Sequence, residues 1–428
     1  MSKTPAHAWW ALAVLTLANV SAFIDRQILS LLVVPLRRDF GITDEQVSYL
    51  MGLTFALFYT VLGLPLGRIA DTRSRRALVG WGVATWSVMT TLSGLARDYP
   101  QLLLARVGVG VGEAALAPAA VSLIADAFPR ERRGTAMSVY ALGTFFGSGL
   151  AYVLGGAVVG VVAEAGTWHW PIVGAVRPWQ SVFLVIGPPG LLVALLFLTV
   201  REPARSRERA SEQGLAALAR WLRGHARLFT MQSLGFALSA AVNYGIAAWL
   251  ATFFVRTHGW PASRAGLVQG ALTMSVGVAG VLAGGRVVDR LARAGRADAP
   301  LLAGIIGAAG MLLFASLYPL VPSATLAVAL LVPVNFFAAF PWGAATAAAA
   351  DVLPPRLRAQ GTALYLLVVN LVSGALGPTA VALATQRVFG GDAGLRYGLA
   401  SATAVGLTLA IALLWAARRP YRDVTALG

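Results

Sequence analysis

Long apolar stretches alternate with short polar connections along almost the entire chain. Twelve of them reach about 20 residues, the length a helix needs to cross the ~30 Å hydrocarbon core of a bilayer. They span residues 9–35, 46–67, 77–96, 101–126, 134–163, 178–199, 228–255, 264–284, 300–321, 323–350, 360–386 and 395–416. The pattern predicts an all-α integral membrane protein with twelve transmembrane helices.

Two halves of the chain repeat each other in sequence order. The polar connection that contains Asp71 and Arg75 returns 218 residues later with Asp289 and Arg293. A second echo relates Asp126, with the later run Gly134-Thr135-Ala136, to Asp351 and the run Gly361-Thr362-Ala363. Parallel repeats of this kind are typical of transporters. We expect two six-helix bundles related by a pseudo-two-fold axis, at residues 1–199 and 228–428.

The longest hydrophilic segment, residues 200–227, joins these predicted bundles as a cytoplasmic linker. Leu215, Leu218, Trp221 and Leu222 recur at helical spacing within it. They could form the apolar face of a short helix lying on the membrane surface. A solvated linker explains the same composition equally well.

Composition and charge support the membrane assignment. The chain is 57% hydrophobic and 12% charged, whereas a soluble domain carries roughly 25% charged residues. The net charge is +16, and 24 of the 34 Lys and Arg fall in segments predicted to be cytoplasmic. This is the positive-inside bias, so the basic balance reports topology and excludes nucleic acid as a partner. It places both termini in the cytoplasm, and the Arg-rich composition suggests a bacterial inner (plasma) membrane.

Several chemistries are excluded by absent residue patterns. The chain contains no Cys, so there is no disulfide framework or thiol chemistry. Its four His are scattered, which argues against a metal site, and no phosphate-binding Gly-x-x-x-x-Gly-Lys-Ser/Thr loop occurs. We therefore expect neither an enzyme, nor a cofactor, nor a self-contained ATP-driven pump. We expect the chain to work as a monomer in the lipid bilayer.

Four charged residues lie inside predicted spans, all in the first half: Asp25, Arg26, Arg106 and Glu113. A charge near the bilayer centre costs at least ~2.5–3.5 kcal/mol, so it faces a partner or a wet cavity and marks a functional site. Arg106 and Glu113 are seven residues apart, about two turns along one helix face. We predict proton coupling at Asp25 and Glu113, with Arg26 and Arg106 as substrate headgroup ligands or charge partners. Two permanent ion pairs that only fix helix packing are the alternative.

The repeated Asp71, Arg75, Asp289 and Arg293 call for another interpretation because they lie at cytoplasmic span ends. We predict that they are gating residues, which hold the two halves together in one state. A basic loop that only sets topology would explain the arginines but not the matching aspartates.

These loop motifs resemble the signature of the major facilitator superfamily over almost the whole chain, with Ser74 and Thr72 departing from the usual glycine and arginine. The pattern Leu102-x-x-x-Arg106-x-x-x-Gly110 resembles the superfamily's second motif. The resemblance implies the major facilitator fold, with a central cavity and rocker-switch alternating access.

A narrower resemblance, to the spinster-like branch, rests on two motifs. These are Asn19 with the run Ile24-Asp25-Arg26 in the first span, and the run Gly110-Val111-Gly112-Glu113-Ala114 with Pro118 in the fourth. Members of this branch are linked to export of sphingosine phosphate or lysophospholipids, some of them proton-dependent. The resemblance implies that Asp25, Arg26 and Glu113 form the proton and headgroup site.

An amphiphilic substrate suits a charged first half and an apolar, aromatic second half. Neutral polar and aromatic residues are candidates for lining the cavity: Asn19, Phe336, Phe340, Tyr365 and Asn370. We therefore predict a proton-coupled secondary transporter of a lysolipid- or sphingolipid-like amphiphile. A multidrug/proton antiporter and an organic-anion/proton symporter stay open as transport alternatives. A lipid scramblase and a membrane sensor are the alternatives outside coupled transport.

Overall fold

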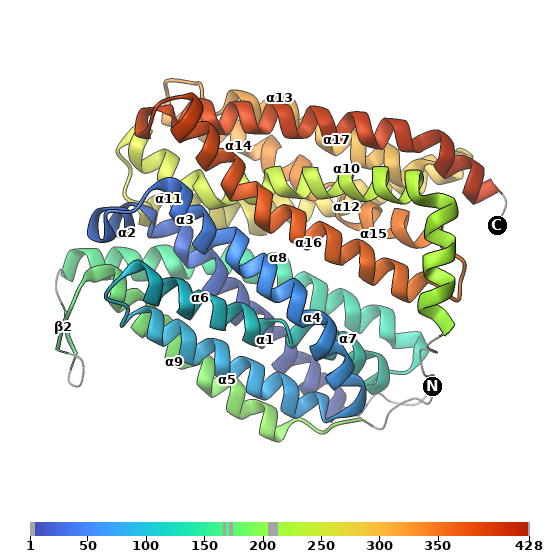
Figure 1. The fold of residues 1–428 in the computed structure, drawn as a ribbon, viewed down its shortest axis with the longest axis horizontal. Coiled ribbons are helices and arrows are strands. Elements are labelled where there is room, and N and C mark those ends of the chain that lie inside the picture. The colour runs from blue at the N-terminus through green and yellow to red at the C-terminus, as the bar shows by residue number, and fades with distance from the viewer. Residues whose placement is uncertain (1–4, 166–167, 171–173, 204–212, 427–428) are drawn as a thin grey trace. The chain divides into compact units, whose positions relative to one another are not determined.

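The structure is a computed structural model that describes residues 5–165, 168–170, 174–203 and 213–426. It consists of helices apart from one short hairpin, as the apolar pattern predicts (Figure 1). Eleven helices in the described part of the chain are long and apolar enough to cross a membrane. The predicted span 77–96 corresponds to a further helix, α5 (Arg75–Ser93), which is less apolar because it begins with two arginines and carries several Ser and Thr.

The described chain packs as two compact units. Unit 1 comprises Met1–Arg207, Leu250–Val255 and Gly259–Met274, and unit 2 comprises Glu208–Trp249, Arg256–His258 and Ser275–Gly428. The predicted bundle limits at residues 199 and 228 stay predictions. One feature differs from a division by sequence alone, because the first part of the eighth predicted span belongs to unit 1.

Unit 1 contains the first six predicted spans. Its elements are α1 (Ala6–Leu31), α2 (Val33–Phe40), α3 (Asp44–Ser48), the π-helix η1 (Tyr49–Leu53), α4 (Thr54–Thr72), α5, α6 (Tyr99–Glu113), α7 (Leu116–Ala127), α8 (Arg130–Ala165), β1 (Trp168–Trp170), β2 (Gly174–Val176), α9 (Pro178–Leu196) and the 3-10 helix η2 (Phe197–Thr199). The two strands pair antiparallel, with Trp168 opposite Val176.

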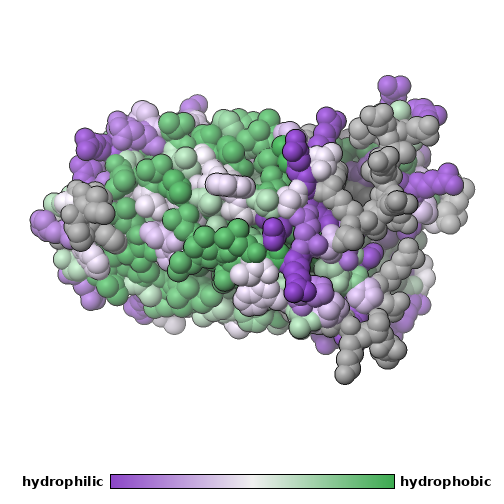
Figure 2. Space-filling view, turned by 90° about the horizontal axis from the view of Figure 1, so that it is seen from below, coloured by the Kyte–Doolittle hydropathy of each residue, from purple (hydrophilic) through white to green (hydrophobic). Residues whose placement is uncertain are grey.

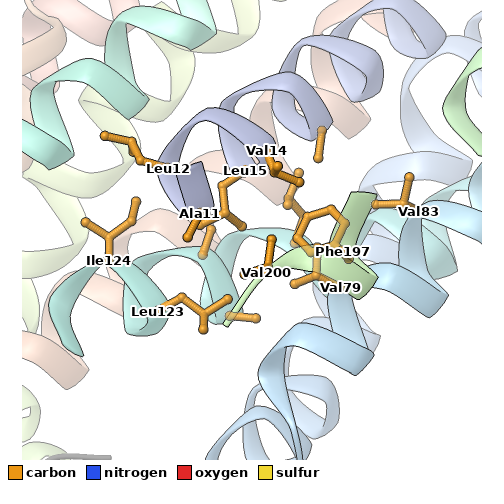
Figure 3. Packing of buried hydrophobic residues seen from close by; sticks show 14 of the residues in the cluster. Ala11, Leu12, Val14, Leu15, Val79, Val83, Leu123, Ile124, Phe197 and Val200 are labelled. Atoms are coloured by element: carbon orange, nitrogen blue, oxygen red, sulfur yellow. The ribbon is translucent and has the colours of Figure 1, made fainter. Parts of the chain in front are cut away.

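Small residues and an apolar core hold unit 1 together. A Cβ added at Gly112 of α6 would lie 2.7 Å from the carbonyl oxygen of Gly82 in α5, so these two backbones approach closely. Close approach through small residues is how membrane helices pack where lipid removes the hydrophobic driving force. Toward one end of the unit, buried side chains of α1, α5 and α7 meet Phe197 and Val200 (Figure 3).

Unit 2 is built around α10 (Gln213–His258), which continues from the predicted linker into the seventh span. The other elements are the π-helix η3 (Thr273–Gly277, shared with unit 1), α12 (Val278–Arg293), α13 (Ala299–Leu317), α14 (Ala324–Ala339), α15 (Trp342–Asp351), α16 (Arg358–Leu383), η4 (Ala384–Val388), η5 (Asp392–Gly394) and α17 (Leu395–Ala426). The remaining helix, α11 (Ala262–Leu272), lies in unit 1.

The predicted short helix of the linker is the first part of α10, which turns at His225, where the backbone is not helical (φ −125°, ψ 22°) (Figure 1). Leu218 is buried there in the core cluster of unit 2 that also contains Leu228 and Phe229. At Leu218, the apolar face of this first part of α10 therefore packs against protein. The side chain of Leu215 lies outside the described residues.

The outer surface is largely apolar. Hydrophobic side chains gather between groups of hydrophilic ones, as Figure 2 shows, and leucines such as Leu104, Leu192 and Leu198 are strongly exposed. Exposed leucine in such numbers is expected of helices that face lipid.

Candidate functional site

The four charges predicted inside spans come together within unit 1, on α1 and α6. Arg26 Nε donates to Glu113 Oε2 at 2.6 Å, and a second guanidinium nitrogen contacts the same oxygen. The Arg26 side chain is 22% exposed, whereas that of Glu113 is 0% exposed. The sequence left open which arginine pairs with Glu113, and the structure pairs it with Arg26.

Three aromatic rings surround the Arg26 guanidinium. Its central carbon lies 4.3 Å from the ring centroid of Phe55, 5.3 Å from Tyr59 and 5.5 Å from Phe23. Phe55 and Tyr59 stack on each other one helical turn apart on α4, with centroids 5.3 Å apart. Cations are attracted to aromatic faces at these distances, so the three rings help to fix the guanidinium beside Glu113.

Asp25 and Arg106 form the deeper part of the site. Arg106 donates to the backbone carbonyl of Asp25 at 3.1 Å. The Asp25 side chain is 3% exposed, and it lies within electrostatic range of Arg106, Glu113 and Arg26. Asp25 and Arg26 are neighbours in sequence, so their side chains diverge by about 100° around the helix. Arg26 therefore lies toward the exposed side of the site and Asp25 toward the interior.

Asn19 lies on the same helix, two turns before Arg26, but does not join this cluster. Its side-chain amide donates to Thr144 Oγ1 of α8 at 3.1 Å. Asn19 therefore ties α1 to α8, and its predicted cavity role stays a prediction.

The predicted gating residue Arg75 is 1% exposed and lies in a dense polar network. Its guanidinium contacts the carboxylates of Asp126 and Glu202, the Ser122 hydroxyl and the Pro203 carbonyl. The Arg75 backbone N–H and the Ser74 hydroxyl also donate to Glu202. Arg75 thus joins α5, α7 and the segment after η2. The side chain of Asp71, the other gating residue predicted in this repeat, lies outside the described residues.

Sequence reasoning did not single out Glu202. Partial burial alone would raise the pKa of this carboxyl, but hydrogen bonds from Ser74 and Arg75 outweigh it and hold the pKa below the ordinary value of 4.5. Its position directly after the sixth span was the available signal, since an acid there faces the N-terminal end of α5, where backbone N–H groups lack partners.

The corresponding residues of unit 2 are arranged differently. Asp289 and Arg293 are exposed, and Arg293 Nε donates to the Asp289 backbone carbonyl one turn earlier at 3.2 Å. The buried acid of this unit is instead Asp298, which accepts from Arg418 Nε at 2.7 Å and Arg296 Nε at 3.3 Å. Burial alone would raise the Asp298 pKa, but the two arginines bring it below its ordinary value.

The second-half candidates for cavity lining lie mostly in packing clusters. Phe340 is buried with Ala303 and Ala344, and Phe336 packs against the same cluster. Tyr365 is buried in the larger core of unit 2. In this structure the rings of Phe340 and Tyr365 fill space between helices, and the cavity roles predicted for them and for Phe336 stay predictions. Asn370 is exposed on α16 and stays a candidate.

Among the residues that the structure describes, no group of three or more His, Cys, Asp or Glu side chains could hold a metal ion. The charged groups of the site can exchange a proton on a carboxyl and present a guanidinium to an anion.

Comparison with known proteins identifies the family. The model of the Major Facilitator Superfamily matches residues 15–378, and the chain belongs to this superfamily. A crystal structure of a bacterial homolog of the human lysosomal transporter Spinster, inward-facing and unoccupied, matches with a TM-score of 0.85 and 28% identity over 99% of both chains. The fold is therefore the all-α, twelve-helix major facilitator fold, and the chain resembles the spinster-like branch.

Two relatives extend the comparison. An MFS-type efflux pump of Mycolicibacterium smegmatis is 29% identical over 98% of this chain and 95% of its own length. Protein spinster homolog 1 of Bos taurus is 34% identical over 72% of this chain, but the match spans 60% of that protein's length. The chain is thus a multi-pass membrane transporter of the secondary type, a class distinct from enzymes.

Proposed function

We propose that the protein is a proton-coupled transporter of an amphiphilic, lysolipid- or sphingolipid-like substrate whose anionic headgroup binds Arg26. The carrying observation is the unequal exposure of the Arg26–Glu113 pair, in which the arginine reaches solvent and the acid is enclosed. An approaching anion meets the guanidinium first. Such planar donors bind phosphate with two parallel hydrogen bonds.

Competition between Glu113 and the headgroup would supply the coupling. Both bind the same guanidinium, so an ionised Glu113 opposes anion binding at Arg26. When Glu113 takes up a proton, the pair loses its negative charge, and the headgroup can replace Glu113 at the Arg26 guanidinium. The net charge of the four-residue site then rises from zero to +1, which favours an anion.

The neighbouring rings support an amphiphile. Phe23, Phe55 and Tyr59 present apolar surface directly beside the charged group. A ligand with a charged head and a hydrocarbon tail can use both surfaces at once. The similarity to proteins named spinster supports the same substrate class.

Export of a cationic drug is the second candidate, and the full-length similarity to an efflux pump favours it. A cation would be attracted to Glu113 or Asp25. Both acids are buried, and Glu113 is already neutralised by Arg26, so the exposed charge has the wrong sign for a cation. An organic-anion symporter would use Arg26 in the same way but without the hydrocarbon tail.

Proton flux in proteoliposomes with a trapped pH dye tests the proposal. We would add sphingosine phosphate, a lysophospholipid, a short organic anion and a cationic dye in turn to wild type and Glu113→Gln. We expect a pH change triggered by a lysolipid and lost in Glu113→Gln. A response to the cationic dye alone would favour the drug antiporter, and a response to the organic anion alone would favour the symporter. Lipid movement without a pH change, unaffected by Glu113→Gln, would indicate a scramblase.

A further inference from the structure

One side of α17 is exposed along most of its length. Tyr397 near the start of this helix and Trp415 in its later part are both strongly exposed, and so are Val405 and Leu409 between them. The opposite side packs into the core of unit 2, where Leu414 is fully buried. The exposed side is therefore an apolar stripe bordered by two aromatic residues, as expected of a helix that faces lipid.

The two aromatic residues are separated by about the width of a hydrocarbon core. Tyr397 and Trp415 are 18 residues apart, which is five helical turns, so they lie on one line of the helix about 27 Å apart. The hydrocarbon core is ~30 Å thick, and Tyr and Trp prefer its two interfaces with water. Trp415 therefore lies at headgroup level, at the end of α17 that the charge distribution of the sequence predicts to be cytoplasmic.

Two arginines continue the exposed side beyond Trp415. Arg419 and Arg422 follow it by four and seven residues, so the three side chains share one helix face, and both arginines are exposed. Neither guanidinium has a hydrogen bond or an ion pair within the described part of the chain. Helical side chains tilt toward the N-terminus, which for α17 is the direction of the membrane. Both arginines are therefore placed to reach back to the headgroup layer.

The charges around this face are predominantly positive. Arg418 lies over the Trp415 ring, with its central carbon 4.4 Å from the ring centroid, and its Nε donates to buried Asp298 at 2.7 Å. Arg296 contacts the same carboxylate, and Asp423 is the acid next in sequence to the exposed arginines. Four arginines thus stand against two aspartates, a net charge of +2, so the face suits an anion.

We propose that the face of α17 formed by Trp415, Arg419 and Arg422 binds an anionic phospholipid of the inner leaflet. The two guanidinium groups donate to the headgroup phosphate, and the acyl chains lie along the apolar stripe toward Leu409. Arginines next to a membrane span attract anionic lipids. A zwitterionic lipid offers the same phosphate but offsets its charge with its own amine, so the face should select the anionic lipid. This inference does not depend on which substrate is transported.

Fluorescence quenching by brominated lipid tests the selection at this face. The chain has no Cys, so Ala416→Cys, at an exposed position beside Trp415, carries a single fluorophore. The protein would be reconstituted in phosphatidylcholine with increasing phosphatidylglycerol, and either lipid would be brominated near its headgroup. Each arginine contributes about a fivefold preference for anionic lipid. We therefore expect phosphatidylglycerol to be preferred, and Arg419→Gln with Arg422→Gln to lower that preference about 25-fold.

The matched control removes the same charge elsewhere in unit 2. Arg220 and Arg223 are exposed on the first part of α10, and Arg220→Gln with Arg223→Gln should retain the preference at Ala416→Cys. A fluorophore at Val405→Cys, ten residues before Trp415, should show no preference in wild type. Both double variants change exposed residues, so their thermal unfolding should match wild type.

Three results would overturn the proposal. Equal quenching by the two lipids in wild type would mean that the face does not select a headgroup. An equal loss of preference in the two double variants would assign it to the net charge of the protein rather than to α17. Quenching by neither lipid would mean that another protein surface, such as a second copy of this chain, covers the stripe.

Discussion

Arg26 and Glu113 form an ion pair in which both side chains are largely removed from water. Breaking such a pair by removing one partner typically costs 3–5 kcal/mol, because the other charge stays buried. Glu113 is the enclosed partner, so loss of Arg26 should be the more harmful change. Arg26 is partly exposed and retains its aromatic neighbours when Glu113 is neutralised.

We therefore predict that Arg26→Met lowers the stability of the detergent-solubilised protein by about 3 kcal/mol. Glu113→Gln should cost less, and the double variant should be more stable than Arg26→Met alone, because it leaves no unpaired carboxylate. Thermal unfolding of the four proteins as a double-mutant cycle measures the coupling. Additive effects would contradict a direct Arg26–Glu113 pair.

Glu202 gives a pH-dependent prediction at the same scale. Its pKa in the folded protein is lowered below 4.5, so its ionised form stabilises the fold at neutral pH. This stabilisation is complete above about pH 5 and is lost as the pH falls through the lowered pKa of the folded state. Glu202→Gln should reduce stability at pH 7 by about 1–2 kcal/mol, the value of hydrogen bonds to a charged group with partial exposure.

The measurement is the melting temperature of wild type and Glu202→Gln between pH 7 and pH 3.5, at one scan rate. The difference between the two proteins should shrink as the pH drops below 4.5. Asp298 titrates in the same direction in unit 2 and serves as an internal comparison through Asp298→Asn. A constant difference across this range would show that Glu202 acts through packing rather than charge.

At the level of elements, apolar length predicted where helices lie but not which helices touch. Hydropathy indicates only that a segment is surrounded by lipid or protein. A span of 20 apolar residues can cross the membrane whichever helices lie beside it. The eighth span is the clearest case. Its first part, α11, packs on α8, with a Cβ at Gly270 reaching the Gly149 carbonyl at 2.5 Å. Its second part, α12, packs on α14, where Gly280 meets the Phe336 carbonyl.

The π-helix η3 separates these two parts, and the limit between the units falls inside it. Single-turn π-helices are frequent at functional sites, yet their extra residue leaves no mark in the apolar pattern. The same limit of sequence reasoning explains why Glu202 was missed, because its partners depend on which helix ends lie together. The importance of the charged residues inside spans could be predicted, because a charge placed in lipid is unfavourable unless it has a partner or a wet cavity.

The contact between α8 and α11 can be tested by cross-linking. A Cβ at Gly160 would lie 3.3 Å from Cβ of Ser263, close to the Cβ separation of about 3.8 Å found in disulfides. The chain has no native Cys, so Gly160→Cys with Ser263→Cys forms one defined pair. We predict that α8 and α11 separate during transport although both lie in unit 1, so we expect rapid oxidation to a disulfide and a loss of transport that dithiothreitol restores.

Each single Cys variant is the control, and it should transport equally with and without oxidant. Full transport by the oxidised double variant would contradict movement between α8 and α11. Failure to form the disulfide in membranes would contradict the contact itself.

For the whole molecule, the internal repeat does not imply equivalent roles. Arg75 and Arg293 occupy matching positions in sequence, but Arg75 is buried among carboxylates and carbonyls while Arg293 is exposed and bonds only its own helix backbone among the contacts described. Unit 2 places its buried charge network on Asp298 and Arg418 instead. The duplicated motif therefore lies at the end of a span in both halves. Among the described residues, a dense polar network surrounds its arginine at Arg75 but not at Arg293.

This asymmetry predicts unequal effects of the same substitution. Arg75→Gln leaves Asp126 and Glu202 without their shared partner, so it should lower stability by about 3 kcal/mol or more. Arg293→Gln removes an exposed charge and should change stability by less than about 0.5 kcal/mol. Thermal unfolding of the two purified variants decides between these expectations. Equal losses of stability would mean that both arginines stabilise their units to the same extent, although Arg293 is exposed. If only Arg75→Gln is destabilised while both variants lose transport, then the duplicated arginines share a function in the transport cycle that packing alone does not supply.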